Sequence, residues 1–164
     1  MATEDLTRAL DEAGAAYELL THAHTESALA EAQALGLSAD DVAKTLIVKT
    51  AEGYLRAVVL ASCRLDERKV RDVTGGSKKD IHLAAEDDLR RDYPDFELGA
   101  VPPVGGSRRD AVIVDSRVKA RESVVLEAGS HEQSVRIATA DLVRAAGAEV
   151  ADICREDEGL AAMP

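Results

Sequence analysis

The chain has 164 residues, of which 46% are hydrophobic and only 2% aromatic, so we expect one domain with an aliphatic core and no single-strand binder built on aromatic stacking. Acidic residues outnumber basic ones by 31 to 20, and the net charge of -11 argues against broad binding to DNA. Two cysteines, no apolar run of about 20 residues and no signal-peptide pattern at the N-terminus favour a reduced, cytoplasmic protein without a membrane anchor.

Helices and strands alternate along the first part of the chain. Apolar periodicity and end signals such as Gly36 predict their bounds. The expected elements are a helix over 4–13, a strand over 15–20, a helix over 25–35, a turn over 38–43 and a hairpin with arms at 44–50 and 54–62.

The second part mixes the two element types without a regular βαβ alternation. We expect helices over 66–75 (capped by Asp66), 84–92 and 140–147 (capped by Thr139), strands over 111–115, 123–129, 133–138 and 148–154, and a loop over 95–106.

Lys44 stands out because it opens an apolar strand in the segment DVAKTLIVK. One interpretation is a solvated strand end. The other is a charge held at the lip of the sheet, where loops gather. The ordinary pKa of lysine is about 10.4, so in the second case Lys44 would hold a carbonyl or phosphate oxygen rather than accept a proton.

Two glycine-containing segments are further candidates. Residues 99–105 read GAVPPVG, which lacks the dinucleotide-binding spacing but lets backbone groups approach a ligand closely. Residues 129–131 read Gly-Ser-His and by themselves indicate a tight turn. Ser130 and His131 are not a catalytic pair by adjacency, because neighbours in a strand point to opposite faces.

The remaining metal-type and thiol side chains have simple interpretations. His22 and His24 lack a third ligand nearby in the sequence, so no metal site is predicted. Cys63 and Cys154 each end an apolar segment, and packing in the core is the expected role of both.

Several motifs occur together in one order: YELLTH, DVAKTLIVK, GAVPPVG, VIVD, LEAGSHEQSVRI and DLVRAAGAEVADI. In this order they resemble the YbaK/ProX family of free-standing aminoacyl-tRNA deacylases, which is related to the editing domain inserted in some bacterial prolyl-tRNA synthetases. The resemblance implies a compact α+β domain over residues 1–155, with a mixed, partly barrel-like sheet flanked by helices. Residues 156–164 are then expected to form a flexible tail.

The resemblance also implies a site. The family's invariant lysine matches Lys44, which is thereby assigned the catalytic role. No metal and no cofactor are implied. The substrate-binding positions that match are His22, Thr45, Gly99, Val101, Pro103, Gly105, Asp115, Gly129, Ser130 and His131.

The implied activity is hydrolysis of the ester that joins a mischarged amino acid to the tRNA 3′ end. Cys-tRNA(Pro), or a similarly small amino acid such as Ala, is the expected substrate, because Lys44-Thr45-Leu46 resembles the cysteinyl-tRNA(Pro) deacylases. Pro102 departs from relatives, which often have Ser or Thr there. No general base is evident, so assistance by the substrate thiol, by a ribose hydroxyl or by water stays open.

The implied partners are the acceptor end of an aminoacyl-tRNA and prolyl-tRNA synthetase. Basic residues that could meet an acceptor stem are Lys78, Lys79, Arg108, Arg109, Arg117, Lys119 and Arg121. The alternative to an enzyme is a non-catalytic tRNA- or nucleotide-binding module that docks on a synthetase.

Overall fold

The computed structural model describes residues 2–156, which fold into six helices and eight strands. The helices are α1 (Ala2–Glu12), α2 (Ala28–Ala34), α3 (Glu67–Thr74), α4 (Glu86–Asp92), α5 (Ser116–Lys119) and α6 (Thr139–Ala146). The strands are β1 (Tyr17–Thr21), β2 (Ala43–Thr50), β3 (Gly53–Leu60), β4 (His82–Leu83), β5 (Ala111–Asp115), β6 (Ser123–Ser130), β7 (Gln133–Ala138) and β8 (Glu149–Ala151).

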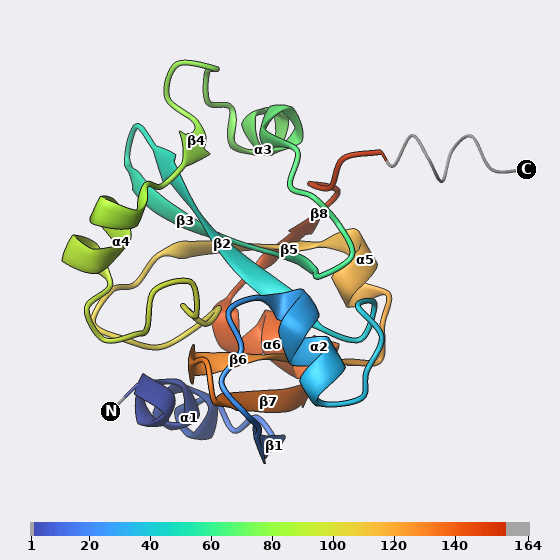
Figure 1. Ribbon diagram of the computed structural model, residues 1–164. Coiled ribbons are helices and arrows are strands. Elements are labelled where there is room, and N and C mark those ends of the chain that lie inside the picture. The colour runs from blue at the N-terminus through green and yellow to red at the C-terminus, as the bar shows by residue number, and fades with distance from the viewer. Residues whose placement is uncertain (1, 157–164) are drawn as a thin grey trace, which may run out of the picture.

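The strands form two sheets (Figure 1). The larger is mixed, with order β4-β2-β3-β5-β8, and combines the antiparallel β2–β3 hairpin with the parallel pairs β3–β5 and β5–β8. The smaller is antiparallel, with order β1-β7-β6. A parallel bridge between Val42 and Val125 joins the two sheets at one corner. The predicted α+β fold with a mixed sheet is therefore confirmed.

The larger sheet is buried on both faces near its centre. One face packs with the smaller sheet, α1 and α6 around side chains that include Leu6, Val58, Val114, Leu126 and Leu142. The other face packs under α3 and the segment after β8, with Val48, Leu55, Val59, Val70 and Ile153. Burial on two faces explains why β3 and β5 read as continuous apolar runs rather than alternating ones.

Most predicted elements are confirmed, with differences at their ends. The second helix begins at Ala28, because the Ser27 hydroxyl accepts a hydrogen bond from the Ala30 N–H (3.1 Å) and caps it. The last helix is capped by Ala138 rather than Thr139, whose hydroxyl donates to the Arg121 carbonyl (2.6 Å) instead. The two-residue strand β4 and the single-turn helix α5 were too short to be predicted from apolar periodicity.

Of the predicted tail, residues 157–164 lie outside the described residues. Glu156 lies within them and pairs with Lys69 (Nζ to Oε1, 3.1 Å). In the part of the chain that the structure covers, every helix is too short or too polar to cross a membrane.

Candidate active site

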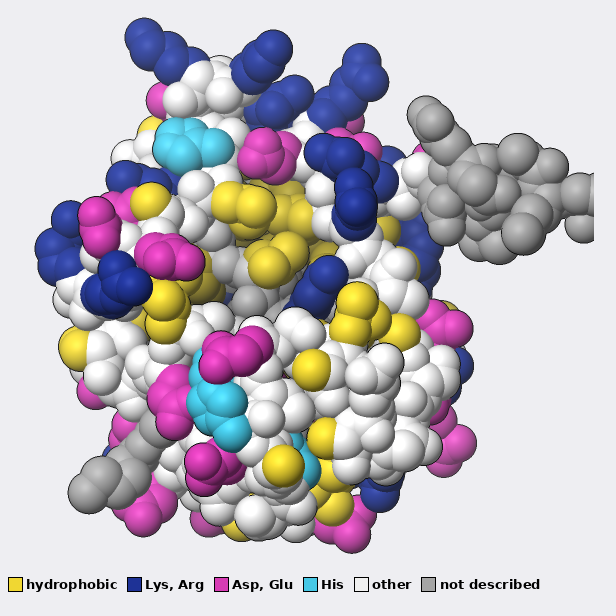
Figure 2. Space-filling view, viewed as in Figure 1, with side chains coloured by type: hydrophobic (Ala, Val, Ile, Leu, Met, Phe, Trp, Pro, Cys, Tyr) yellow, Lys and Arg dark blue, Asp and Glu magenta, His cyan; other side chains and the backbone are white. Residues whose placement is uncertain are grey.

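A small cavity lies where β2 and β6 diverge. Val42, the residue before β2, forms a bridge with Val125 of β6, and the two strands then continue in different sheets. A cavity of about 190 Å³ opens beyond that point. Seen from this side, the surface over β2 and β3 is hollowed and lined by hydrophobic side chains (Figure 2). The cavity is lined by Ser27, Ala28, Ala43, Lys44, Thr45, Leu46, Gly99, Ala100, Val101 and Glu127.

Lys44 brings a positive charge to this cavity. It is half-buried near the start of β2, opposite Val59 of β3. Partial burial lowers the pKa of its ammonium group. Within residues 2–156 no oxygen lies in hydrogen-bond or ion-pair range of Lys44 Nζ. A cation held this way is available to an oxygen ligand that enters the cavity.

Glu127 and His131 form a buried pair at the cavity wall. Their side chains are 10% and 6% exposed, and His131 Nδ1 lies 2.8 Å from Glu127 Oε2. His131 Nε2 lies 2.7 Å from the Leu98 carbonyl, which can only accept, so Nε2 carries a proton. Both ring nitrogens of His131 are therefore engaged, and the imidazole holds Glu127 on one side and the 97–101 loop on the other.

The titration of this pair follows from its burial. Burial raises the pKa of Glu127 to about 7, against the opposing effect of the charge and hydrogen bond of His131. Burial alone would lower the pKa of His131, but the hydrogen bond to Leu98 and the charge of Glu127 raise it. Since Nε2 keeps its proton, the carboxyl and Nδ1 share one further proton near neutral pH.

A second carboxyl group is buried behind the pair. Glu31 of α2 is fully buried, and the Ser134 hydroxyl joins its Oε2 to His22, whose Nε2 lies 2.8 Å from Ser134 Oγ. Glu31 Oε1 is buried without a hydrogen-bond partner in the described chain. Burial raises the pKa of Glu31 to about 8, so this carboxyl is mostly protonated at pH 7.

The comparison with protein families gives this geometry its context. Residues 22–145 match the model of the aminoacyl-tRNA editing domain. The chain belongs to this family. The matched segment includes every residue that lines the Lys44 cavity, whereas α1, β1 and β8 fall entirely outside it.

Solved structures agree with the family assignment. A candidate trans-editing enzyme for prolyl-tRNA synthetase is 25% identical, with a TM-score of 0.84 over 94% of this chain and 98% of its own. The hypothetical protein APE2540 is also 25% identical, with a TM-score of 0.83 over 92% of this chain and 99% of its own. These likenesses cover the whole editing domain rather than one motif.

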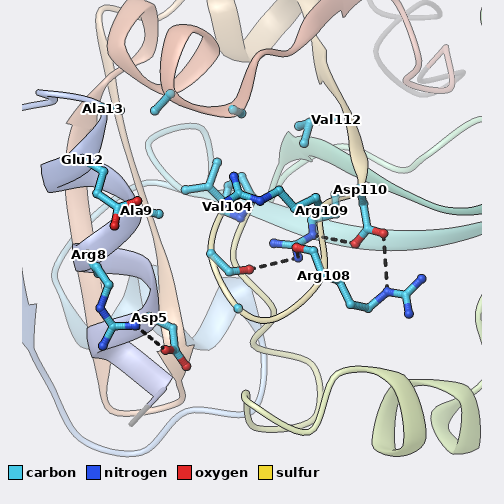
Figure 3. Close-up of a pocket in the computed structure, with 16 residues that line it drawn as sticks. Asp5, Arg8, Ala9, Glu12, Ala13, Val104, Arg108, Arg109, Asp110 and Val112 are labelled. Atoms are coloured by element: carbon cyan, nitrogen blue, oxygen red, sulfur yellow. Dashed lines mark hydrogen bonds and ion pairs between the residues drawn. The ribbon is translucent and has the colours of Figure 1, made fainter.

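The editing domain has a larger cavity of about 430 Å³ on another side (Figure 3). It lies between α1, the 103–112 segment and the end of α6. Several of its charged side chains pair with one another, as Arg8 does with Asp5 (3.4 Å) and Arg108 with Asp110 (3.5 Å). Pro103 and Gly105 line this cavity and not the one at Lys44. A Cβ on Gly105 would lie 2.7 Å from the Asp5 carbonyl oxygen, so close packing on α1 requires the glycine.

The predicted site residues therefore lie in different parts of the structure. Lys44, Thr45, Gly99 and Val101 line one cavity. His131 lies directly behind it, because a Cβ on Gly99 would be 3.7 Å from His131 Cε1. Gly129 is on the same side, since its carbonyl accepts from the Glu97 N–H (2.9 Å).

Three other predicted residues have local partners instead. Asp115 is fully buried and caps α5 by accepting from the Arg117 N–H (2.9 Å), and it also accepts from the Ile153 N–H (2.9 Å). Ser130 accepts from the Glu132 N–H (3.0 Å) in the turn after β6, and His22 bonds to Ser134. None of them lines the Lys44 cavity.

The thiols and basic clusters also have defined surroundings. Cys154 is buried and Cys63 partly buried against the same cluster, as predicted. Of the basic residues, Arg117 pairs with Asp152 (3.0 Å) and Arg121 with Asp41.

No three His, Cys, Asp or Glu side chains of residues 2–156 lie close enough together to hold a metal ion.

Glu127 was missed as a site residue at the level of sequence. The signal was present, because it is a charged residue inside the apolar run SVVLEAG, and such a residue needs a partner when buried. Glu31 in α2 and Arg56 in β3 carry the same signal. Their partners could not be named, because they come from distant segments.

The protonated state of Glu31 gives a measurable pH dependence of stability. Its pKa is about 8 in the folded chain against an ordinary value of 4.5, so the unfolded chain releases this proton first as pH rises. Between these values the free energy of unfolding is expected to fall by up to about 1.4 kcal/mol per pH unit because of Glu31. Urea unfolding of the wild type and of Glu31→Gln at pH 5, 6, 7 and 8 measures it.

The difference between the two proteins isolates Glu31 from other titrating groups. Glutamine keeps the shape and a carbonyl oxygen that accepts from the Ser134 hydroxyl, but it does not titrate. The stability of Glu31→Gln relative to the wild type should therefore increase as pH rises from 5 to 8. Two parallel stability curves would contradict the assigned protonation of Glu31.

Proposed function

We propose that this editing domain hydrolyses the ester bond of a mischarged aminoacyl-tRNA, with Cys-tRNA(Pro), or a similarly small amino acid such as Ala, as substrate. The observation that carries the proposal is the unpartnered, half-buried Lys44 ammonium in a cavity inside the family-matched segment. A volume of about 190 Å³ is below the ~300 Å³ of typical ligand pockets and suits a small aminoacyl group.

The chemistry of the cavity supports ester cleavage. Attack on an ester places negative charge on the carbonyl oxygen, and a fixed cation nearby stabilises that charge. The 99–103 loop adds backbone donors. Pro102 and Pro103 have no N–H and the Ala100 N–H donates to Glu97 (3.0 Å), but the N–H groups of Gly99 and Val101 have no acceptor within residues 2–156.

The proposed tRNA substrate and synthetase partner are based on the similar proteins. The aminoacyl-tRNA acceptor end is the substrate class of the family, and one similar structure is a candidate trans-editing enzyme for prolyl-tRNA synthetase. We therefore propose prolyl-tRNA synthetase as the enzyme whose errors this chain corrects, in the cytoplasm, with no DNA or membrane partner.

A panel of aminoacyl-tRNAs tests the proposal directly. The protein is incubated with Cys-tRNA(Pro), Ala-tRNA(Pro) and correctly charged Pro-tRNA(Pro), and release of the labelled amino acid is followed. We expect one of the two mischarged species to be cleaved and Pro-tRNA(Pro) to be spared. If the protein binds the tRNA but the amino acid is released no faster than by spontaneous hydrolysis, the non-catalytic binding module is favoured instead.

The affinity for tRNA should depend only weakly on salt. Lys and Arg side chains gather over α3 and the segment after it (Figure 2), where Lys78 and Lys79 are exposed and have no ion-pair partner in the described chain. Contact with a few phosphates predicts a slope of log K against log salt concentration of about -2 to -4. Binding titrations at several salt concentrations between about 50 and 200 mM measure this slope.

The double variant Lys78→Ala/Lys79→Ala is the matched test of this footprint. Removing two phosphate contacts should flatten the slope by about 2. A wild-type slope near about -10 would mean an extensive interface that the acidic surface does not support. A slope of zero would point to a ligand other than nucleic acid.

A further inference from the structure

We propose that Glu127 is the general base of this deacylation and takes a proton from the water that attacks the aminoacyl carbonyl carbon. The inference rests on the proposed function and deepens it, because it assigns the proton acceptor that the sequence left open.

Strand geometry places Glu127 on the same face as Lys44. Val42 of the segment before β2 and Val125 of β6 are bridge partners in parallel orientation and pack in the same hydrophobic cluster. Lys44 and Glu127 each lie two residues further along, so the alternation of side chains puts both on the face of that valine pair. Both residues line the cavity that opens there.

The carboxyl group has one oxygen held and one free. Oε2 is bonded to His131 Nδ1 (2.8 Å), and that imidazole is fixed in turn by the Leu98 carbonyl (2.7 Å). Oε1 has no hydrogen-bond partner among residues 2–156. A carboxylate oriented by a buried histidine, with its second oxygen left to the cavity, is the arrangement that a positioned base requires.

The charges around Glu127 come from several elements. Glu26 and Glu97 lie in the loops on either side, Glu31 in α2 and His131 in the turn after β6. Lys44 of β2 lines the same cavity. The acidic neighbours and burial favour the protonated carboxyl, whereas His131 favours the ionised one. The resulting pKa of about 7 is near working pH, where a general base is most effective.

The reaction balances with water as the only co-reactant. The water oxygen forms a bond to the carbonyl carbon, its proton passes to Glu127 Oε1, and the Lys44 ammonium holds the carbonyl oxygen as it becomes negative. The bond from that carbon to the ribose oxygen then breaks. The ribose oxygen takes the proton back from Glu127, and the products are the free amino acid and an uncharged tRNA 3′ end.

The test compares Glu127→Gln, Glu127→Asp and the matched control Glu132→Gln, which changes an exposed carboxyl in the turn after β6. Single-turnover deacylation of the species cleaved by the wild type is measured from pH 5.5 to 8.5, after subtraction of spontaneous hydrolysis. The wild-type rate should rise with pH and level off above an apparent pKa near 7. Glu127→Gln should lose about 10²–10⁴-fold in rate together with this inflection, and Glu132→Gln should change neither.

Glu127→Asp keeps the titrating group on a shorter arm, so it should be slower than the wild type but keep the inflection. It decides the matter if circular dichroism shows that Glu127→Gln does not fold. A Gln variant with near-wild-type rates and an unchanged pH profile overturns the inference, while the proposed function stands. A Gln variant that reaches the wild-type maximal single-turnover rate, but only at higher enzyme concentration, also overturns it and assigns Glu127 to binding the substrate's ammonium group. A wild type that cleaves no aminoacyl-tRNA removes the proposed function itself.

Discussion

Lys44→Ala is expected to slow deacylation by at least about 10²–10³-fold, the usual effect of removing one fixed donor to a developing oxyanion. The ammonium group has no partner among the described residues and lines the cavity, so its removal breaks no interaction inside the fold. Stability should therefore change little. Single-turnover rates with the mischarged tRNA, together with urea unfolding, measure the two effects separately.

Two further variants sharpen this result. Lys44→Arg should also fail, because a planar guanidinium does not replace a compact ammonium group in a small cavity. Lys49→Ala is the control on the same strand. Its side chain lies on the opposite face by alternation, is 40% exposed and pairs with Asp88 (3.5 Å), so its loss should be nearly silent. Normal deacylation by Lys44→Ala would leave the binding module as the better description.

Local pattern was enough to predict the elements that carry Lys44. The hairpin of β2 and β3 was predicted because two apolar runs flank a short break, and both arms are found with Lys44 opposite Val59. The position of Lys44 at the lip of a sheet follows from that hairpin alone. Its cavity does not, because the opposite wall comes from Glu127 of β6 and from the 99–101 loop, and strand periodicity does not say which distant segments will meet.

The 99–105 motif is a second case in which the sequence alone could not predict which segments meet. As a sequence it reads as one ligand loop, but the structure places Gly99 and Val101 at the Lys44 cavity and Pro103 and Gly105 beside α1. The two halves of this segment therefore line different cavities. Arg56 of β3 holds the loop between them, because its guanidinium donates to the Pro102 and Gly105 carbonyls.

Arg56→Met is expected to destabilise the fold by about 3–5 kcal/mol, the usual cost of removing one partner of a buried ion pair. Arg56 and Asp110 are 2% and 4% exposed, with 3.1 Å between Nε and Oδ2. The guanidinium also donates to Pro102 O (2.9 Å) and Gly105 O (3.0 Å). Methionine fills a similar volume but removes the buried cation that pairs with Asp110 and the donor to these two carbonyls, which leaves Asp110 with the Tyr93 hydroxyl and the longer contact to Arg108. Urea unfolding at pH 7 measures the loss.

The second variants separate charge from packing. Arg56→Met/Asp110→Asn should recover part of the loss, because the remaining carboxamide is neutral and can still accept from the Tyr93 hydroxyl, which now donates to Asp110 Oδ2 (2.7 Å). Arg90→Met is the exposed control, since Arg90 is 60% exposed and its pairs with Glu86 and Asp87 are at the surface. It should stay within about 0.5 kcal/mol of the wild type. If Arg56→Met were as mild as Arg90→Met, the loop would be held by its prolines and by packing, and the guanidinium would not be what divides the motif between the two cavities.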